Sequence, residues 1–138
     1  MNAAALLAAK CASCRTEFHH ASFGDLAYGE AVLSTSDGRR FARASAGSDF
    51  AQRVANLLTG NDRTIWPFLA ALADPIDGLA MTHRIVCPAC RSTELESWGG
   101  TRLGLTEIPD VTFTASERLT PTELANRVAA IRHELPGD

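Results

Sequence analysis

The residues of this chain whose types and spacing most clearly indicate chemistry are its four cysteines. They form two pairs with the same spacing, Cys11-Ala12-Ser13-Cys14 and Cys87-Pro88-Ala89-Cys90. A Cys-x-x-Cys turn brings two thiolates together and leaves the following backbone N–H groups free to hydrogen-bond to sulfur, and two facing turns create a tetrahedral site of four sulfurs. The spacing therefore predicts that Cys11, Cys14, Cys87 and Cys90 bind one structural metal ion, with zinc favoured over iron.

Other chemistry for these cysteines stays open at this point. The second pair is similar to the dithiol of glutaredoxin-type proteins, which predicts a thiol redox protein as one alternative, although such a protein has no need of the first pair. Independent disulfides are a further alternative. A zinc deaminase would carry an upstream His-x-Glu or Cys-x-Glu, and the sequence has neither. Four cysteine ligands leave no open position for a catalytic water, so we expect a protein that is not an enzyme.

The two pairs and their flanking segments resemble the zinc-ribbon or rubredoxin-like superfamily. The second pair follows an apolar segment that ends at Val86, as in the second knuckle of that family. The resemblance implies a structural metal held by knuckles on β-hairpins. It says little about the biological function, because zinc ribbons occur in transcription and translation proteins, in enzymes and in scaffolds. Arg15 and Arg91 occupy the positions where family members often carry glycine for a left-handed turn.

Three histidines lie within a few residues of the knuckles: His19, His20 and His83. Each is a candidate to replace a cysteine as ligand or to hydrogen-bond to one. Because four cysteines already complete a tetrahedral site, we favour exposed or hydrogen-bonded histidines without a metal role.

A basic cluster, Arg39, Arg40, Phe41 and Arg43, is the candidate contact for nucleic acid. On a strand, Arg39, Phe41 and Arg43 would share one face that offers phosphate contacts and base stacking. The whole chain carries a formal net charge of −3, so it has no general attraction for a polyanion. A nucleic-acid-binding zinc ribbon is therefore possible but not favoured.

The cysteines must be positioned by the elements of one domain, since the chain has 138 residues, 46% of them hydrophobic. An alanine-rich helix is predicted over 1–10, and the Ser36-Asp37-Gly38 turn predicts a hairpin between 26–35 and 39–44. Apolar periodicity predicts helices over 49–59 and 65–73. Strands over 84–86 and 92–98 would place Cys87 and Cys90 at a hairpin tip, and a further strand is predicted over 111–114.

The last helix has the clearest local signature. Thr120 is the predicted N-cap, Pro121 occupies the first position and Glu123 completes a capping box. An apolar stripe follows, made of Leu124, Val128, Ile131 and Leu135. We expect this helix to dock on its own domain or in the groove of a partner, with 101–116 as a loose tether.

These observations predict an α+β fold in which a split zinc ribbon contains an inserted hairpin and two helices, followed by a C-terminal helix. The ribbon-like domain spans 1–104 with its insertion at 15–82, and 105–138 hold the tether and the helix. The apolar stretch over 65–73 is too short for a bilayer, and no targeting signal is evident, so a cytoplasmic protein is expected. We expect a non-enzymatic interaction module or accessory subunit that binds a protein partner.

Overall fold

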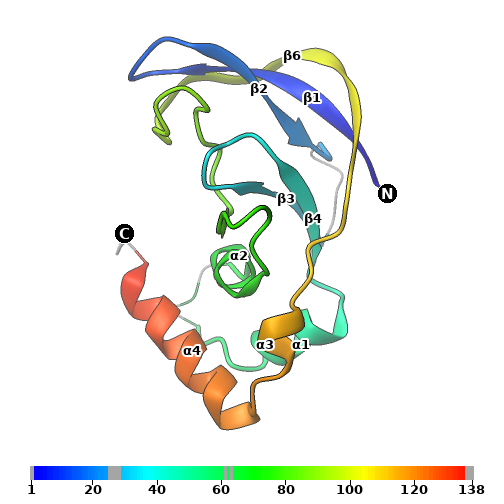
Figure 1. Cartoon of the computed structure of the whole chain (residues 1–138), viewed down its shortest axis with the longest axis vertical. Coiled ribbons are helices and arrows are strands. Elements are labelled where there is room, and N and C mark those ends of the chain that lie inside the picture. The colour runs from blue at the N-terminus through cyan, green and yellow to red at the C-terminus, as the bar shows by residue number, and fades with distance from the viewer. Residues whose placement is uncertain (1, 25–28, 61, 63, 136–138) are drawn as a thin grey trace.

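The computed structural model describes residues 2–24, 29–60, 62 and 64–135. These residues form two three-stranded antiparallel sheets and four helices (Figure 1). The first sheet has the strand order β2-β1-β6 and consists of β1 (Asn2–Cys11), β2 (Glu17–Ser22) and β6 (Leu95–Ile108). The second has the order β4-β3-β5 and consists of β3 (Glu30–Thr35), β4 (Phe41–Ser45) and β5 (Met81–Thr82). The helices are α1 (Asp49–Ala55), α2 (Trp66–Leu72), α3 (Thr114–Glu117) and α4 (Pro121–Glu134). The predicted α+β class is confirmed.

The N-terminal segment is a strand, so the helix predicted over 1–10 is wrong. β1 is the central strand of the first sheet, and its Ala5 lies opposite Ser22 of β2 and Leu105 of β6. An unbroken apolar run has no period that separates a helix from a strand covered on both faces. Pairing along both edges of β1 outweighs the high helix propensity of alanine.

The hairpin predicted around Ser36-Asp37-Gly38 is confirmed by β3 and β4, which pair from Glu30–Ser45 to Ser34–Phe41. The Asp37 carboxylate accepts hydrogen bonds from the Thr35 hydroxyl and from the backbone N–H of Arg39. Residues 26–28, predicted to begin the first strand, lie outside the described residues.

The predicted pair of helices is present, and both are shorter than expected. α1 ends at Ala55 rather than at residue 59, and α2 covers Trp66–Leu72 with Pro67 in its first turn. α2 packs against α1, α4 and β5, in the centre of Figure 1. These helices and the second sheet build the main core, whose largest fully buried side chains include Phe68, Leu33, Leu69, Leu124 and Val54.

The segments around the second cysteine pair differ most from the prediction. Residues 84–86 form no strand, so Cys87 and Cys90 do not lie at a hairpin tip. Of the strand predicted over 92–98, residues 95–98 belong to β6, which extends to Ile108 and pairs with β1. Consequently 101–108 are not a tether. The strand predicted over 111–114 is also absent: residues 111–113 form no helix or strand, and Thr114 begins α3.

The C-terminal helix is confirmed with its complete capping box. The Thr120 hydroxyl accepts from the Glu123 N–H at 3.2 Å, and the Glu123 carboxylate accepts from the Thr120 N–H at 2.9 Å. The stripe of α4 faces the main core, where Leu124, Val128 and Ile131 are buried and Leu135 is partly buried. Of the two docking modes that we expected, the structure shows the helix on its own chain.

Candidate metal centre

The four cysteine sulfurs meet at the end of the first sheet. All four Sγ atoms lie within 4.8 Å of one another, and the described residues hold no disulfide among them. The Sγ atoms of Cys11 and Cys90 are 3.5 Å apart, and those of Cys14 and Cys87 are 3.6 Å apart. A tetrahedral zinc site with Zn–S distances of about 2.3 Å places its sulfurs about 3.8 Å apart. The predicted convergence of the two pairs is therefore confirmed, and the donor set fits one metal ion such as Zn²⁺.

The two knuckles repeat one pattern of backbone hydrogen bonds. The N–H of Cys11 donates to the carbonyl of Thr16 at 3.0 Å, and the N–H of Cys87 donates to the carbonyl of Ser92 at 2.9 Å. Both turns read Cys-x-x-Cys-Arg followed by Ser or Thr in the sequence. This repeated motif is the signal by which Thr16 and Ser92 could have been assigned to the site from the sequence.

The arginine after each pair adopts the left-handed conformation, as the family resemblance implied for these positions. The φ angles are 64° at Arg15 and 65° at Arg91. In this conformation the Arg15 N–H donates to the Cys11 carbonyl at 3.1 Å and the Arg91 N–H donates to the Cys87 carbonyl at 2.8 Å. Two residues other than glycine thus accept a strained backbone so that each turn can close around its thiols.

The knuckles are also joined to each other, although one follows β1 and the other precedes β6. The Ala12 N–H donates to the Glu94 carbonyl at 2.9 Å. The Ser13 hydroxyl donates to the Ser92 hydroxyl at 3.0 Å. The pairing of β1 with β6 therefore extends into the cysteine turns, and sheet formation brings the two pairs together.

The inserted β3–β4 hairpin supports the second knuckle. Its turn residue Gly38 is buried, with φ of 74°, and lies directly against the backbone of Val86 and Pro88. A Cβ at this glycine would overlap the Val86 carbonyl oxygen. The Asp-Gly turn therefore allows both the hairpin and the close approach of the knuckle.

The cysteines differ in exposure and in acidity. Cys11 and Cys87 are fully buried, whereas Cys14 and Cys90 are exposed. Hydrogen bonds between Cys14 and the side chain and backbone of Thr16 lower the pKa of Cys14 to about 6. At Cys90 the backbone hydrogen bond from Ser92 lowers the pKa, but the neighbouring cysteine sulfurs outweigh it and raise the pKa to about 12. Crowding of this kind is relieved when a cation stabilises all four thiolates.

Glu96, which the sequence did not assign to the metal site, connects the first knuckle to β6. Its carboxylate lies 3.1 Å from the Lys10 ammonium and 3.3 Å from the Arg15 guanidinium. The Arg15 cation is therefore paired beside the sulfurs. The sequence alone does not show that Glu96 lies near Lys10, because this requires knowing that β6 pairs with β1.

None of the three candidate histidines belongs to the sulfur cluster. His20 is buried, its Nδ1 lies 2.7 Å from the Ala21 carbonyl oxygen, and burial lowers its pKa to about 4. Its ring packs edge-on against Phe41, with centroids 4.7 Å apart. His83 is partly buried, which lowers its pKa, and His19 lies beside Pro88 in an open surface groove.

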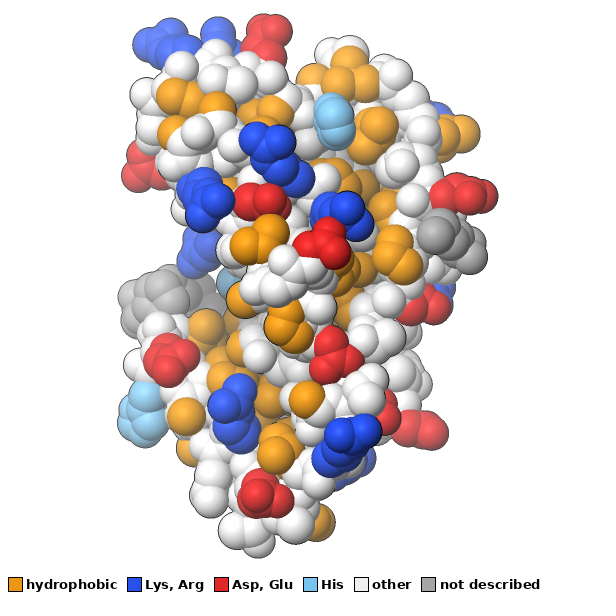
Figure 2. Space-filling model, in the orientation of Figure 1, with side chains coloured by type: hydrophobic (Ala, Val, Ile, Leu, Met, Phe, Trp, Pro, Cys, Tyr) orange, Lys and Arg blue, Asp and Glu red, His pale blue; other side chains and the backbone are white. Residues whose placement is uncertain are grey.

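The basic cluster does not form the stacking platform that we considered. Phe41 is partly buried against the small core under the first sheet. The Arg43 guanidinium is paired with Glu30 at 2.7 Å and with Asp110 at 2.8 Å. Arg40 pairs with Asp77 at 3.0 Å, and Arg39 is exposed beside the groove. On the face shown in Figure 2, acidic and basic side chains alternate without a continuous basic surface.

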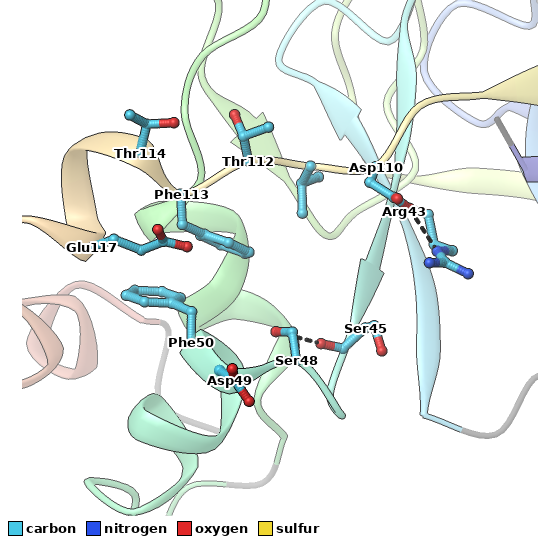
Figure 3. A pocket seen from close by; sticks show the side chains of 11 residues that line it. Arg43, Ser45, Ser48, Asp49, Phe50, Asp110, Thr112, Phe113, Thr114 and Glu117 are labelled. Atoms are coloured by element: carbon cyan, nitrogen blue, oxygen red, sulfur yellow. Dashed lines mark hydrogen bonds and ion pairs between the residues drawn. The ribbon is translucent and has the colours of Figure 1, made fainter.

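A separate cavity of about 420 Å³ lies between the end of β4, the start of α1 and residues 110–117 (Figure 3). The Arg43–Asp110 ion pair lies at one end, and the stacked rings of Phe50 and Phe113, with centroids 4.6 Å apart, lie at the other. The Ser48 hydroxyl is used to cap α1. The lining contains no histidine, cysteine or lysine, and its charged side chains are Arg43, Asp49, Asp110 and Glu117.

Comparison with protein-family models, with curated proteins and with solved structures finds no match to this chain. Among the described residues, no helix has the length and apolar character needed to cross a bilayer.

Proposed function

We propose that this chain is a structural-zinc protein in which one Zn²⁺, bound by Cys11, Cys14, Cys87 and Cys90, joins the two knuckles of a split ribbon. The observation that carries the proposal is the meeting of four sulfurs within 4.8 Å of one another. A site of four thiolates suits zinc or iron, and zinc is the usual occupant of such structural sites. The biological role that we propose is that of a non-enzymatic interaction module, an accessory subunit that binds a protein partner.

Two features support a structural rather than a catalytic metal. All four tetrahedral positions are supplied by protein sulfur, so none is left for a water or a substrate. The knuckles also belong to segments that are remote in the sequence. Among the described residues, the small core beneath the first sheet has Ala4, Ala21 and Ile108 as its buried members. A metal at the end of this sheet adds the stability that so small an apolar cluster does not supply.

Metal analysis of the purified protein tests the proposal. We expect about one zinc per chain in the wild type. Cys87→Ser should lose the metal and lower the free energy of unfolding by more than about 3 kcal/mol, because the free energy of metal binding contributes to folding. Ala89→Ser is the matched control, since it changes an exposed residue between the same two cysteines. It should retain zinc and the wild-type melting temperature.

Other outcomes are equally decisive. A folded protein without metal whose thiols oxidise and reduce reversibly would support the redox alternative and overturn ours. One iron per chain, with a visible thiolate-to-iron absorption, would preserve the structural site and correct its metal.

A further inference from the structure

The exposed large apolar side chains of the described residues all lie on one strand, β6. They are Trp98, Leu103 and Leu105, with exposed fractions of 39%, 56% and 66%. In the described part of the chain, β6 pairs on one side only, with β1, and forms the edge of the first sheet (Figure 1). An edge strand presents unpaired N–H and C=O groups, and apolar side chains along it favour pairing with another strand.

The adjacent strand extends this apolar surface. Ala3 of β1 is exposed opposite Glu107, and Ala5 lies opposite Leu105. On the other face of β1, Ala4 and Leu6 pack into the small core under the sheet. A strand with apolar side chains on both faces is typical of a sheet that is covered on both faces. In this single chain, the small core covers one face of β1.

We propose that β6 pairs with β6 of a second copy of this chain, in antiparallel orientation. Leu103 and Leu105 are flanked by Arg102 on one side and Glu107 on the other. An antiparallel two-fold arrangement brings the basic end of one segment to the acidic end of the other, whereas a parallel arrangement would align like charges. Two-fold dimers present the same patch from both subunits, so a patch that complements itself in this way suits a second copy.

We place the two-fold axis at Gly104, where the pairing of β6 with β1 shifts register. Leu6 pairs with Gly104 and Leu7 with Arg102, so Leu103 is an additional residue that has no partner in β1. An axis at Gly104 places Leu103 of each copy opposite Leu105 of the other, with the two glycines at the centre. Four leucines then cover one another, and the two three-stranded sheets become one sheet of six strands. This proposal is independent of the metal.

Light scattering on the 138-residue chain, as it elutes from a size-exclusion column, measures its mass directly. We expect twice the 14.7 kDa of one chain for the wild type. Leu105→Glu should weaken dimerisation at least tenfold and elute as a monomer at the concentration where the wild type is a dimer, because it places two carboxylates against the leucines. Ala71→Glu is the matched control: it adds the same charge at an exposed alanine on α2 and should remain a dimer.

Far-ultraviolet circular dichroism, compared with the wild type, establishes that Leu105→Glu is folded. A second measurement, amide hydrogen exchange, uses the wild-type protein alone. Amide protons of 102–107 that do not pair with β1 should exchange slowly at high protein concentration and quickly after dilution. A wild type that is monomeric at every concentration, or a folded Leu105→Glu that is still a dimer, would overturn the proposal. A monomer that binds zinc would leave the proposed function intact, and a dimer without metal would contradict only that function.

Discussion

At the scale of single residues, the metal centre depends on backbone conformations as much as on sulfur. Arg15 and Arg91 hold equivalent left-handed positions and close the two turns. Gly38 is different, because it must be glycine for two reasons, its positive φ and its contact with the second knuckle. A residue more than forty positions before Cys87 in the sequence therefore decides where that cysteine can lie.

Substitution of Gly38, compared with substitution of a second glycine, separates the cost of the left-handed backbone from the cost of the contact with the second knuckle. Gly38→Ala should destabilise the protein by more than about 3 kcal/mol, of which left-handed strain accounts for about 1–2 kcal/mol and overlap with the Val86 carbonyl for the rest. Gly78→Ala is the control, because Gly78 has a similar φ of 78° and no atom lies within 4 Å of the position that its Cβ would take. This variant should show only the cost of the strain. Chemical denaturation measures both, and equal losses would show that the contact with the knuckle is unimportant.

At the scale of elements, the C-terminal helix is fastened to the chain by more than its apolar stripe. The Arg132 guanidinium donates to both carboxylate oxygens of Asp62 at 2.8–3.2 Å and to the Leu57 carbonyl. The Asp62 side chain is 4% exposed. The hydrogen bond from Arg132 and one from the Thr59 backbone lower the pKa of Asp62 to about 2. This ion pair joins the segment between α1 and α2 to α4.

A lowered carboxylate pKa predicts the direction of the pH dependence. The contribution of Asp62 to stability is fully present above its ordinary pKa of 3.8 and is lost as the pH falls through about 2. The melting temperature of the wild type should therefore approach that of Asp62→Asn between pH 4 and pH 2. Acid also releases metal from both proteins, so the measured quantity is their difference at each pH.

The control for this prediction is a double-mutant cycle with Arg132→Gln. The two single substitutions remove the same pair, so the double variant should be little less stable at neutral pH than either single variant. Additive losses, or a difference between wild type and Asp62→Asn that does not change with pH, would contradict the assignment.

At the scale of the whole molecule, the two sheets have unequal cores. In the described part of the chain, the main core of the second sheet and the helices has fifteen buried members, whereas the small core under the first sheet has three. The end of the first sheet instead carries the cysteine cluster, and its outer edge carries the exposed leucines of β6. We therefore expect the first sheet to rely on the metal far more than the helices do.

Removal of the metal should affect the two parts differently. After chelation, amide hydrogen exchange should become fast in β1, β2 and β6, while amides of α2 and α4 stay protected by the main core. Mass spectrometry of peptides from the exchanged protein measures this region by region. Uniform loss of protection would show one cooperative unit, and unchanged protection in the first sheet would show that the metal is not needed for it.

The sequence by itself determined the features whose interactions are local. These are the two Cys-x-x-Cys turns, the Asp-Gly hairpin and the capped C-terminal helix, since each depends on residues a few positions apart. The tertiary structure alone decided that 2–11 form a strand, that β6 continues to Ile108, and that Gly38 lies against the second knuckle. The partners in these cases are remote in the sequence, and an apolar run such as 3–9 carries no period that reveals them. Backbone pairing across the chain outweighs local propensity there, and only the assembled sheet shows which edge of β6 remains open.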